Sequence, residues 1–314
     1  MRPERGFALL AVMLVLTLLA VVVTEFAFSM RLEASMVRSY RDSLLAAHLA
    51  EAAVQQAIRE ILSQAQITAL DQDRQLIFYR ALPGQTLPAR LPALPRSHVP
   101  LGAGEFSYRI TDEAARLNIN ATAPERLDRL LTALGLEKPQ RDIINDSLQD
   151  WRDGDEVHRL NGAESEDFYL RLPVPYRSRN GDLQDAAELL QIRGVTRELY
   201  AGTPERPGLG DLVTAVGVNA VNLNTAPAPV LKALGLSEAE IADVLETRAR
   251  APYLTVPGRF AGRGLAVRSA IFRIEAEGRV AGSPPSHVLA IVQRGGRISA
   301  LGVTVLSWRP ETNG

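Results

Sequence analysis

Residues 7–24 read FALLAVMLVLTLLAVVVT, and this run without a charged residue decides the architecture of the chain. As an α-helix it would be about 27 Å long, which is enough to cross the hydrocarbon core of a bilayer. Arg2 and Arg5 precede the run and predict a cytoplasmic N-terminus, with the rest of the chain on the other side. A cleaved secretory signal peptide is the alternative, because Ala27-Phe28-Ser29 could serve as its cleavage site.

The apolar run continues into a segment with helical periodicity. Residues 30–64 contain no Gly or Pro. Their apolar side chains recur at steps of three and four residues: Met30, Val37, Leu44, Leu45, Leu49, Ala52, Ala53, Ile58, Ile61 and Leu62. We therefore expect one long helix that begins in the membrane and ends near Gln64, with an amphipathic outer half that packs on a folded domain.

The strand signals fall into two groups that lie far apart in the sequence. Residues 81–104 are rich in Pro and Gly and predict a loop, after which the alternating residues 106–110 predict a strand. Three more strands are predicted near the C-terminus, at residues 270–280, 286–293 and 303–308. The segment between the two groups is largely helical. These patterns indicate an α+β fold, in which a small sheet packs on the long helix and carries an inserted helical domain.

A weak internal repeat lies within the expected insert. Residues 117–120 and 221–224 have the related sequences LNIN and VNLN, and each is followed by Thr-Ala-Pro and later by Leu-Gly-Leu. We expect Thr122 and Thr225 to cap the helices that follow, and the glycine to end each helix. Such units resemble helix-hairpin-helix or SAM-like modules, which often bind DNA. The acidic residues of both copies argue against nucleic acid here.

Composition excludes several classes of function. The 314 residues include no cysteine and carry a formal net charge of −1. Disulfides, cysteine-ligated zinc and thiol catalysis are therefore excluded, and no general attraction to nucleic acid is expected. The four histidines, His48, His98, His158 and His287, are not spaced as a metal-binding pair. No serine-hydrolase, phosphate-loop or dinucleotide-binding motif is present, so we do not expect an enzyme.

The most distinctive chemistry lies in an acidic loop at residues 150–188. Asp150, Asp153 and Asp155 lie close together, and Gly154 and Gly162 allow turns around them. Carboxylates on glycine-containing loops suit calcium, which takes about six to eight oxygen ligands, although this spacing is not that of an EF-hand. A solvated loop without metal is the other interpretation. Its charges would be neutralised in part by Arg152, Arg159, Arg171, Arg177 and Arg179.

The N-terminus resembles that of type IV pilins and type II secretion pseudopilins. A short basic leader ends in Gly6, and Phe7 opens the apolar helix. The resemblance implies that a prepilin peptidase cleaves between Gly6 and Phe7 and methylates the new amine of Phe7. Most pilins carry a glutamate at the fifth mature position, which is Ala11 here. A subunit without this glutamate suits the first position of a filament, where no earlier subunit offers an amine to pair with.

Within type II secretion, the large minor pseudopilin K is the member that this sequence resembles. The shared residues are Asp150-Trp151-Arg152-Asp153-Gly154-Asp155, Asn161-Gly162-Ala163-Glu164, Tyr169, Pro175-Tyr176-Arg177, Asn180, Asp185 and Glu188-Leu189. The resemblance implies a structural calcium site, which we place on Asp150, Asp153, Asp155, Glu164 and Asp167, with Glu166 as an alternative to Asp167. It also divides the chain into a leader (1–6), a transmembrane helix (7–24), a pilin-like helix and first strand (25–111), an inserted helical domain (112–265) and a C-terminal sheet (266–314).

The resemblance implies a role in assembly. The chain would be an inner-membrane, single-pass protein with its soluble domain in the periplasm, at the tip of the type II secretion pseudopilus. Its expected partners are the minor pseudopilins I and J, other pseudopilins, the prepilin peptidase and inner-membrane lipid. The alternative is a membrane-anchored periplasmic binding or hydrolytic module that takes no part in a filament.

Overall fold

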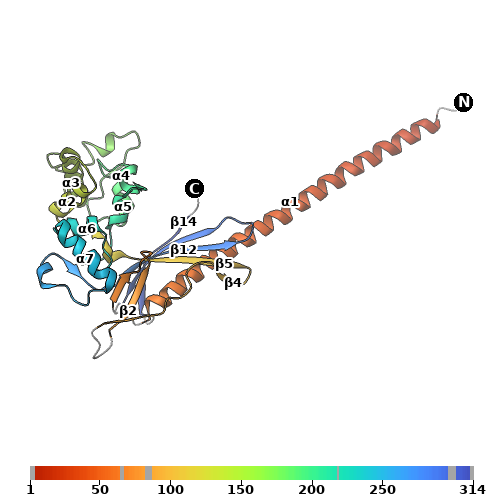
Figure 1. Cartoon of the computed structure of the whole chain (residues 1–314). Coiled ribbons are helices and arrows are strands. Elements are labelled where there is room, and N and C mark those ends of the chain that lie inside the picture. Colours follow the sequence, from red (N-terminus) through yellow and green to blue (C-terminus); the bar gives the residue numbers. More distant parts are fainter. Residues whose placement is uncertain (1–3, 64–66, 82–86, 218, 296–301, 312–314) are drawn as a thin grey trace.

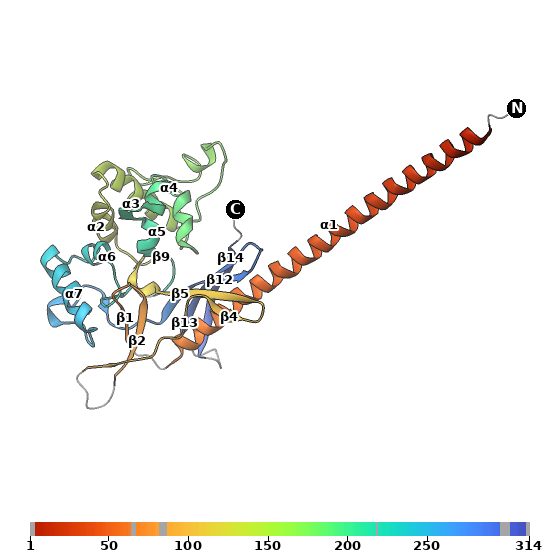
Figure 2. The ribbon, with the colours of Figure 1, turned by 45° about the vertical axis from the view of Figure 1, so that its right-hand side comes forward.

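The computed structural model describes residues 4–63, 67–81, 87–217, 219–295 and 302–311. A long N-terminal helix packs at one end against an antiparallel sheet, and a separate group of helices lies beyond the sheet (Figure 1). The architecture is therefore α+β, as predicted. Both views place the helical domain at the end of the molecule remote from the N-terminus (Figures 1 and 2).

Helix α1 spans Glu4–Ile61, so it ends slightly before the expected Gln64. It is long and apolar enough near the N-terminus to cross a membrane, by length and composition. Residues 8–41 are exposed, and burial begins in earnest at Ala46. From there Ala50, Ala53 and Ala57 are fully buried at helical spacing against the sheet. The helix therefore has two parts, an uncovered N-terminal part and a C-terminal part that belongs to the core.

The main sheet has the strand order β14-β13-β12-β5-β4, and every neighbouring pair is antiparallel. Its strands are β4 (Val99–Leu101), β5 (Gly104–Asp112), β12 (Ile271–Val280), β13 (Ser286–Arg294) and β14 (Val303–Glu311). The expected pairing across the insert is present, since Ile274 of β12 lies opposite Ile110 of β5. Alternate residues of β12 are buried toward α1. At Gly278 a Cβ would lie 2.0 Å from the carbonyl oxygen of Ala46, so glycine permits this close approach.

The interpretation of residues 81–104 as loop alone was wrong. They include β4 and also β3 (Ala89–Arg90), which pairs with β2 (Leu76–Arg80) in a second sheet completed by β1 (Ile67–Leu70). Strands of two or three residues are too short to show an alternating pattern, and Pro and Gly around them conceal the signal.

The inserted helical domain has a hydrophobic core of its own, separate from the core between α1 and the main sheet. Its helices are α2 (Pro124–Ala133), α3 (Lys138–Arg152), α4 (Arg197–Ala201), α5 (Leu209–Leu212), α6 (Ala228–Ala233) and α7 (Glu238–Arg250). Its short strands are β6 (Leu117–Asn118), β7 (Gly202–Thr203), β8 (Arg206–Pro207), β9 (Val213–Thr214), β10 (Val221–Asn222) and β11 (Leu265–Ala266). The 3₁₀ turns are η1 (Glu113–Ala115), η2 (Tyr169–Arg171), η3 (Ala186–Gln191) and η4 (Gly258–Phe260). The limits of the five expected segments of the chain stay predictions.

The internal repeat corresponds to two copies of one structural unit. In the first copy β6 leads into α2 and α3 and pairs in parallel with β9; in the second, β10 leads into α6 and α7 and pairs in parallel with β11. Gly135 and Gly235 follow α2 and α6 with φ of 81° and 84°, as expected for glycines that end helices. The predicted threonine caps were wrong, because the cap positions are Ala123 and Pro227.

The two copies also share a set of hydrogen bonds from asparagine and arginine side chains to the backbone. Asn120 binds Leu183 through both backbone groups, at 2.8 and 2.9 Å, and Asn224 binds Tyr253 in the same way, at 3.0 and 2.7 Å. The last helix of each copy also supplies an arginine, which binds the backbone between two asparagines of the LNIN or VNLN sequence. Nη1 of Arg152 donates to the carbonyl oxygen of Ile119 (2.8 Å), and Nη1 of Arg248 donates to the carbonyl oxygen of Leu223 (3.1 Å).

The helical domain meets the sheet at a buried polar cluster, which we call the junction cluster: Thr68, Asp112, Asn222, Thr225 and Ser269. Oδ2 of Asp112 accepts hydrogen bonds from Asn222 (2.8 Å), Thr225 (2.6 Å) and Ser269 (2.5 Å). Its Oδ1 accepts one from the backbone of Ala114 (2.9 Å). All five side chains find hydrogen-bond partners, so the cluster joins both ends of the insert to β1 and β5 without an unsatisfied group.

Candidate functional site

The acidic loop begins at the C-terminal end of α3. This helix starts with a capping box, in which Glu137 and Gln140 bind each other's backbone N–H groups. Near its other end Trp151 is buried edge-to-face against Tyr169, with ring centroids 5.2 Å apart, and also contacts the ring of Tyr176. These aromatic contacts tie the returning loop to the helix, so the carboxylate of Asp150 beside them is held in a fixed place.

Asp150 is fully buried and is bound by one residue of the loop, Arg159. The Arg159 guanidinium lies 2.6 Å from Asp150 Oδ1 and 2.6 Å from Asp153 Oδ2. The Arg159 backbone N–H also donates to both Asp150 oxygens, at 3.2 and 3.1 Å. These two carboxylates raise the pKa of Arg159 above its usual value, chiefly through the hydrogen bond that the guanidinium donates to Asp153. One arginine therefore bridges two of the predicted metal ligands.

Glu164 is the second buried carboxylate of the loop, with only 1% of its surface exposed. Burial raises the pKa of Glu164 to about 7, and the charges of Asp150 and Asp153 act in the same direction. A hydrogen bond of 3.0 Å from Ser178 to Oε2 opposes this rise. The other oxygen, Oε1, is buried and has no hydrogen-bond partner among the described residues.

The remaining predicted ligands hold local turns of the loop. Asp155 is exposed and accepts from the backbone of Val157 at 2.9 Å, and Asp167 accepts from the backbone of Glu164 at 3.0 Å. Glu166, the alternative to Asp167, is largely exposed and pairs with Arg177. The structure thus brings Asp150 and Asp153 together on Arg159, and their charges act on nearby Glu164, while Asp155 and Asp167 hold turns of the same loop. Within the described ranges, no three acidic or histidine side chains form a ready-made metal site.

The donor set fits a hard cation in one respect. Three oxygens around the loop are buried without a donor: Asp153 Oδ1, Glu164 Oε1 and Asn180 Oδ1. Buried oxygens are normally hydrogen-bonded, and orphans of this kind indicate an ion or water. Oxygen ligands from carboxylates and amides are those that calcium prefers. Asp150, Asp153 and Glu164 therefore suit calcium in chemistry, although Arg159 occupies part of their binding capacity.

Sequence reasoning missed how closely Gly162 approaches the buried carboxylate. A Cβ at this position would lie 1.8 Å from Asp150 Oδ2. Only glycine leaves room for Asp150 at this point of the loop, whereas a Cβ at Gly154 would meet nothing within 4 Å. Gly162 was predicted only as a turn former, because the sequence does not tell which side chain crosses over it.

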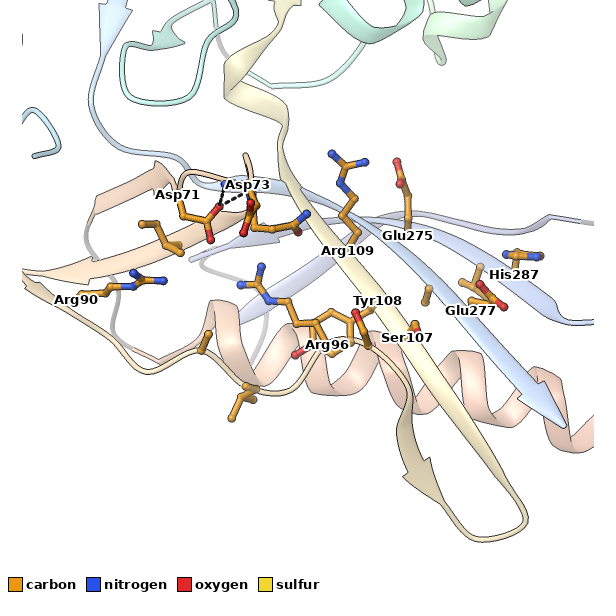
Figure 3. A pocket seen from close by; sticks show the side chains of 17 residues that line it. Asp71, Asp73, Arg90, Arg96, Ser107, Tyr108, Arg109, Glu275, Glu277 and His287 are labelled. Atoms are coloured by element: carbon orange, nitrogen blue, oxygen red, sulfur yellow. Dashed lines mark hydrogen bonds between the residues drawn. The ribbon is translucent and has the colours of Figure 1, made fainter. Parts of the chain in front are cut away.

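A groove of about 710 Å³ lies elsewhere, on the main sheet near β1 and β2 (Figure 3). Arg109 and Glu275 point away from α1, while Tyr108 and Arg96 lie toward it and both bind Glu60 of α1. Asp71 at its edge accepts from the backbone of its own turn, at 3.0 and 2.8 Å. These contacts are structural, and they leave the acidic loop as the candidate site.

Comparison with known proteins shows a similarity to one family over most of the helical domain. Two models described as "Type II secretion system (T2SS), protein K" match residues 109–203 and 221–266, which together cover most of the helical domain. The type II secretion system protein K of Pectobacterium carotovorum subsp. carotovorum is 32% identical over 179 residues, which are 51% of this chain and 52% of that protein. The chain thus matches about half the length of that relative.

Two further comparisons extend over more of the chain. The putative type II secretion system protein K of Escherichia coli (strain K12) is 27% identical over 272 residues, 80% of this chain and 77% of that protein. A chain from the crystal structure of the GspK-GspI-GspJ complex of enterotoxigenic E. coli has the same fold, with a TM-score of 0.68 at 20% identity. That match covers 88% of this chain and 99% of the other. The family models and the relatives show that this chain is similar to type II secretion system protein K, and the solved structure shows that it shares the fold of a GspK-GspI-GspJ complex chain.

Proposed function

We propose that this protein is a minor pseudopilin at the tip of the type II secretion pseudopilus. The observation that carries the proposal is the arrangement of its two ends. The uncovered part of α1, residues 8–41, projects from one end, and the helical domain lies at the other (Figures 1 and 2). A helix in this position is suited to pack among the helices of other pseudopilins. A helical domain at the far end would obstruct any subunit stacked beyond it.

Ala11 supports a place at the end of a filament. A carboxylate within the apolar segment would be costly unless it paired with a positive group, such as the N-terminal amine of a neighbouring subunit. With Ala11 this chain has no such carboxylate at the fifth position after Gly6. The chain therefore needs no preceding subunit in the filament.

The proposal extends to processing, location and partners. Prepilin peptidase would cleave between Gly6 and Phe7, two residues that lie within the start of α1. Arg2 and Arg5 favour a cytoplasmic N-terminus, and we infer from this that α1 would lie in the inner membrane and the soluble domain in the periplasm. A solved relative of this fold comes from a GspK-GspI-GspJ complex. We infer that the minor pseudopilins I and J are partners of this chain as well.

Mass spectrometry of the mature N-terminus tests this proposal. Protein extracted from membranes of a strain with an intact type II system should begin at methylated Phe7, and Gly6→Leu should abolish both cleavage and co-purification with I and J. An intact Met1 in the unsubstituted protein, or a start near Met30, would contradict the filament role. Such a result would favour a lone membrane-anchored module.

Calcium is the second part of the proposal. Asp150, Asp153 and Glu164 would hold the ion, with Asp155 and Asp167 as further ligands from the adjoining turns. The ion would supply positive charge between carboxylates that otherwise repel one another, and so would fix the shape of the loop. Support comes from the unpartnered oxygens of Asp153, Glu164 and Asn180.

The melting temperature in calcium and in chelator tests this part. The full chain in detergent should melt higher in calcium, because an ion that binds only the folded state stabilises it. Glu164→Gln should remove most of that difference. Glu166→Gln is the matched control, because Glu166 is exposed and pairs with Arg177 at 3.1 Å. An unchanged melting temperature in calcium would rule out the site.

A further inference from the structure

Arg159 places a positive charge inside the acidic loop, on the oxygens that a metal ion would use. Its Nη1 atom lies 2.6 Å from Asp150 Oδ1 and 2.6 Å from Asp153 Oδ2. An ion bound to these two oxygens and the Arg159 guanidinium cannot occupy them together, because both are positively charged and need the same lone pairs.

The backbone and the side chain of Arg159 differ in how firmly they are held. The backbone N–H donates to Asp150, which is fully buried, and so keeps that carboxylate in position. The Arg159 side chain is 42% exposed, so its guanidinium borders solvent. The guanidinium can therefore leave the carboxylates by side-chain rotation, without unfolding the loop.

The charge balance shows that Arg159 alone does not complete the cluster. Asp150, Asp153 and Glu164 carry three negative charges when ionised, and Arg159 compensates one of them. The Oε1 atom of Glu164 and the Oδ1 atom of Asp153 remain buried without a donor. Arg159 therefore neutralises only part of the cluster. The unused oxygens and the remaining negative charge can still bind a cation of higher charge.

We propose that the Arg159 guanidinium is a built-in counter-ion, which holds the acidic loop in shape without metal and is displaced from Asp150 and Asp153 when a divalent cation binds. The proposal rests on the calcium site proposed above. Its consequence is that Arg159 lowers the affinity for the ion while it stabilises the metal-free protein. The loop then keeps its fold at low calcium, instead of collapsing when the ion leaves.

The test uses the full chain in detergent with two variants of equal charge change. Arg159→Gln removes the bridging guanidinium. Arg177→Gln removes an arginine of the same loop that pairs with exposed Glu166, 3.1 Å away. Calcium affinity is measured by titration calorimetry, and melting temperature is measured in chelator and in excess calcium. Arg159→Gln should bind calcium about tenfold more tightly, because a competing charge-assisted hydrogen bond is gone. Arg177→Gln should change affinity less than about threefold, because exposed charges are screened.

The melting temperatures separate competition from a merely structural role. Arg159→Gln should melt below the unsubstituted protein in chelator, and should equal or exceed it in excess calcium. If Arg159→Gln were the one protein of the three that binds calcium, the proposal would also be supported. Binding by all three proteins with no gain for Arg159→Gln, or an equal loss of melting temperature in both conditions, would overturn the role of Arg159 and leave the calcium site intact. Absence of binding in all three would remove the site itself, and this inference with it.

Discussion

The two copies of the helical unit share a scaffold and differ in what is built on it. In both copies an asparagine, Asn120 or Asn224, binds a backbone segment that lies further along the chain. In both, an arginine of the last helix binds the backbone between strand and helix. The first copy then inserts residues 153–212 between α3 and β9, and this insertion carries the acidic loop. The second copy has only residues 251–264 between α7 and β11, and uses Asn222 for the junction cluster. One copy is therefore specialised for the loop, and the other for attachment to the sheet.

The two polar clusters show this specialisation in their hydrogen bonds. In the junction cluster all five side chains find partners, so it needs nothing further. In the acidic loop Asp153, Glu164 and Asn180 each retain a buried oxygen without a donor. A closed polar network fixes a structure, whereas an open one of the same residue types is suited to a ligand.

The largest effect is expected at the junction. Asp112→Ala would remove the shared acceptor of the buried Thr225 and Ser269 hydroxyls and one of the acceptors of Asn222, and should lower the free energy of unfolding by about 3–5 kcal/mol. Urea unfolding of residues 31–314, which retain every buried residue of the described structure, measures this loss. Asn118→Ala is the control from the first copy, since within the described residues its side-chain amide donates to Gly217 and accepts from the Asn120 backbone, and it should cost about 1–2 kcal/mol. Equal losses would show that the second copy is not specialised for attachment.

A smaller loss is expected from Gly162→Ala in the acidic loop. The new Cβ would lie 1.8 Å from Asp150 Oδ2, so the buried carboxylate must move, at a cost of about 2–3 kcal/mol. The same variant should lose the calcium-dependent rise in melting temperature. Gly154→Ala is the matched control: its Cβ meets nothing within 4 Å, and its effect should stay within about 0.5 kcal/mol. A tolerated Gly162→Ala that still responds to calcium would separate Asp150 from the metal.

The shared scaffold predicts similar effects in the two copies. Arg152→Ala and Arg248→Ala each remove a donor to a backbone carbonyl between strand and helix, and each should cost about 1–2 kcal/mol in urea unfolding. Arg248 also binds Ala226 at 2.7 Å, so its loss should be the slightly larger one. A wide difference between the two losses would show that the arginine contact with the backbone stabilises only one copy of the repeat.

The parts of this molecule that the sequence predicted are those governed by local periodicity. The long helix, strands β5, β12, β13 and β14, and both copies of the repeat follow from patterns within one segment. The cap at Thr225 failed because a tertiary contact prevailed over local preference: Thr225 donates to Asp112 at 2.6 Å. The Thr122 hydroxyl is buried and makes no hydrogen bond within the described residues. In each copy proline, not threonine, stands where the helix begins.

The site could be predicted in composition but not in pairing. The acidic residues and glycines of the loop were identifiable, because calcium ligands have a recognisable chemistry. That Arg159 bridges Asp150 and Asp153, and that Asp155 and Asp167 hold turns, depends on how the loop folds back on α3. The junction cluster was missed for the same reason, since its members come from segments far apart in sequence.

The smallest effect tests whether the first copy also contributes to attachment. Asp185, near the end of the acidic loop, pairs with Arg309 of β14 across the two parts of the molecule. Burial alone would raise the pKa of Asp185, but the hydrogen bonds from Arg309 and the Ala187 backbone, together with the charges of Arg309 and Arg273, outweigh it and hold the pKa below its usual 3.8. A depressed pKa means that the pair contributes stability above the unfolded-state pKa and loses it as the pH falls through the folded-state value.

Arg309→Ala should therefore lower the free energy of unfolding by only about 0.2–1 kcal/mol at pH 7, because the arginine is partly exposed. The loss should shrink as the pH falls from 7 to an acidic value at which Asp185 is protonated in the folded state. Urea unfolding of residues 31–314 at both pH values measures the difference, with Arg250→Ala as control for an exposed pair within a single helix. A loss that persists at low pH would assign the role of Arg309 to packing on β14, and would leave attachment of the helical domain to the second copy alone.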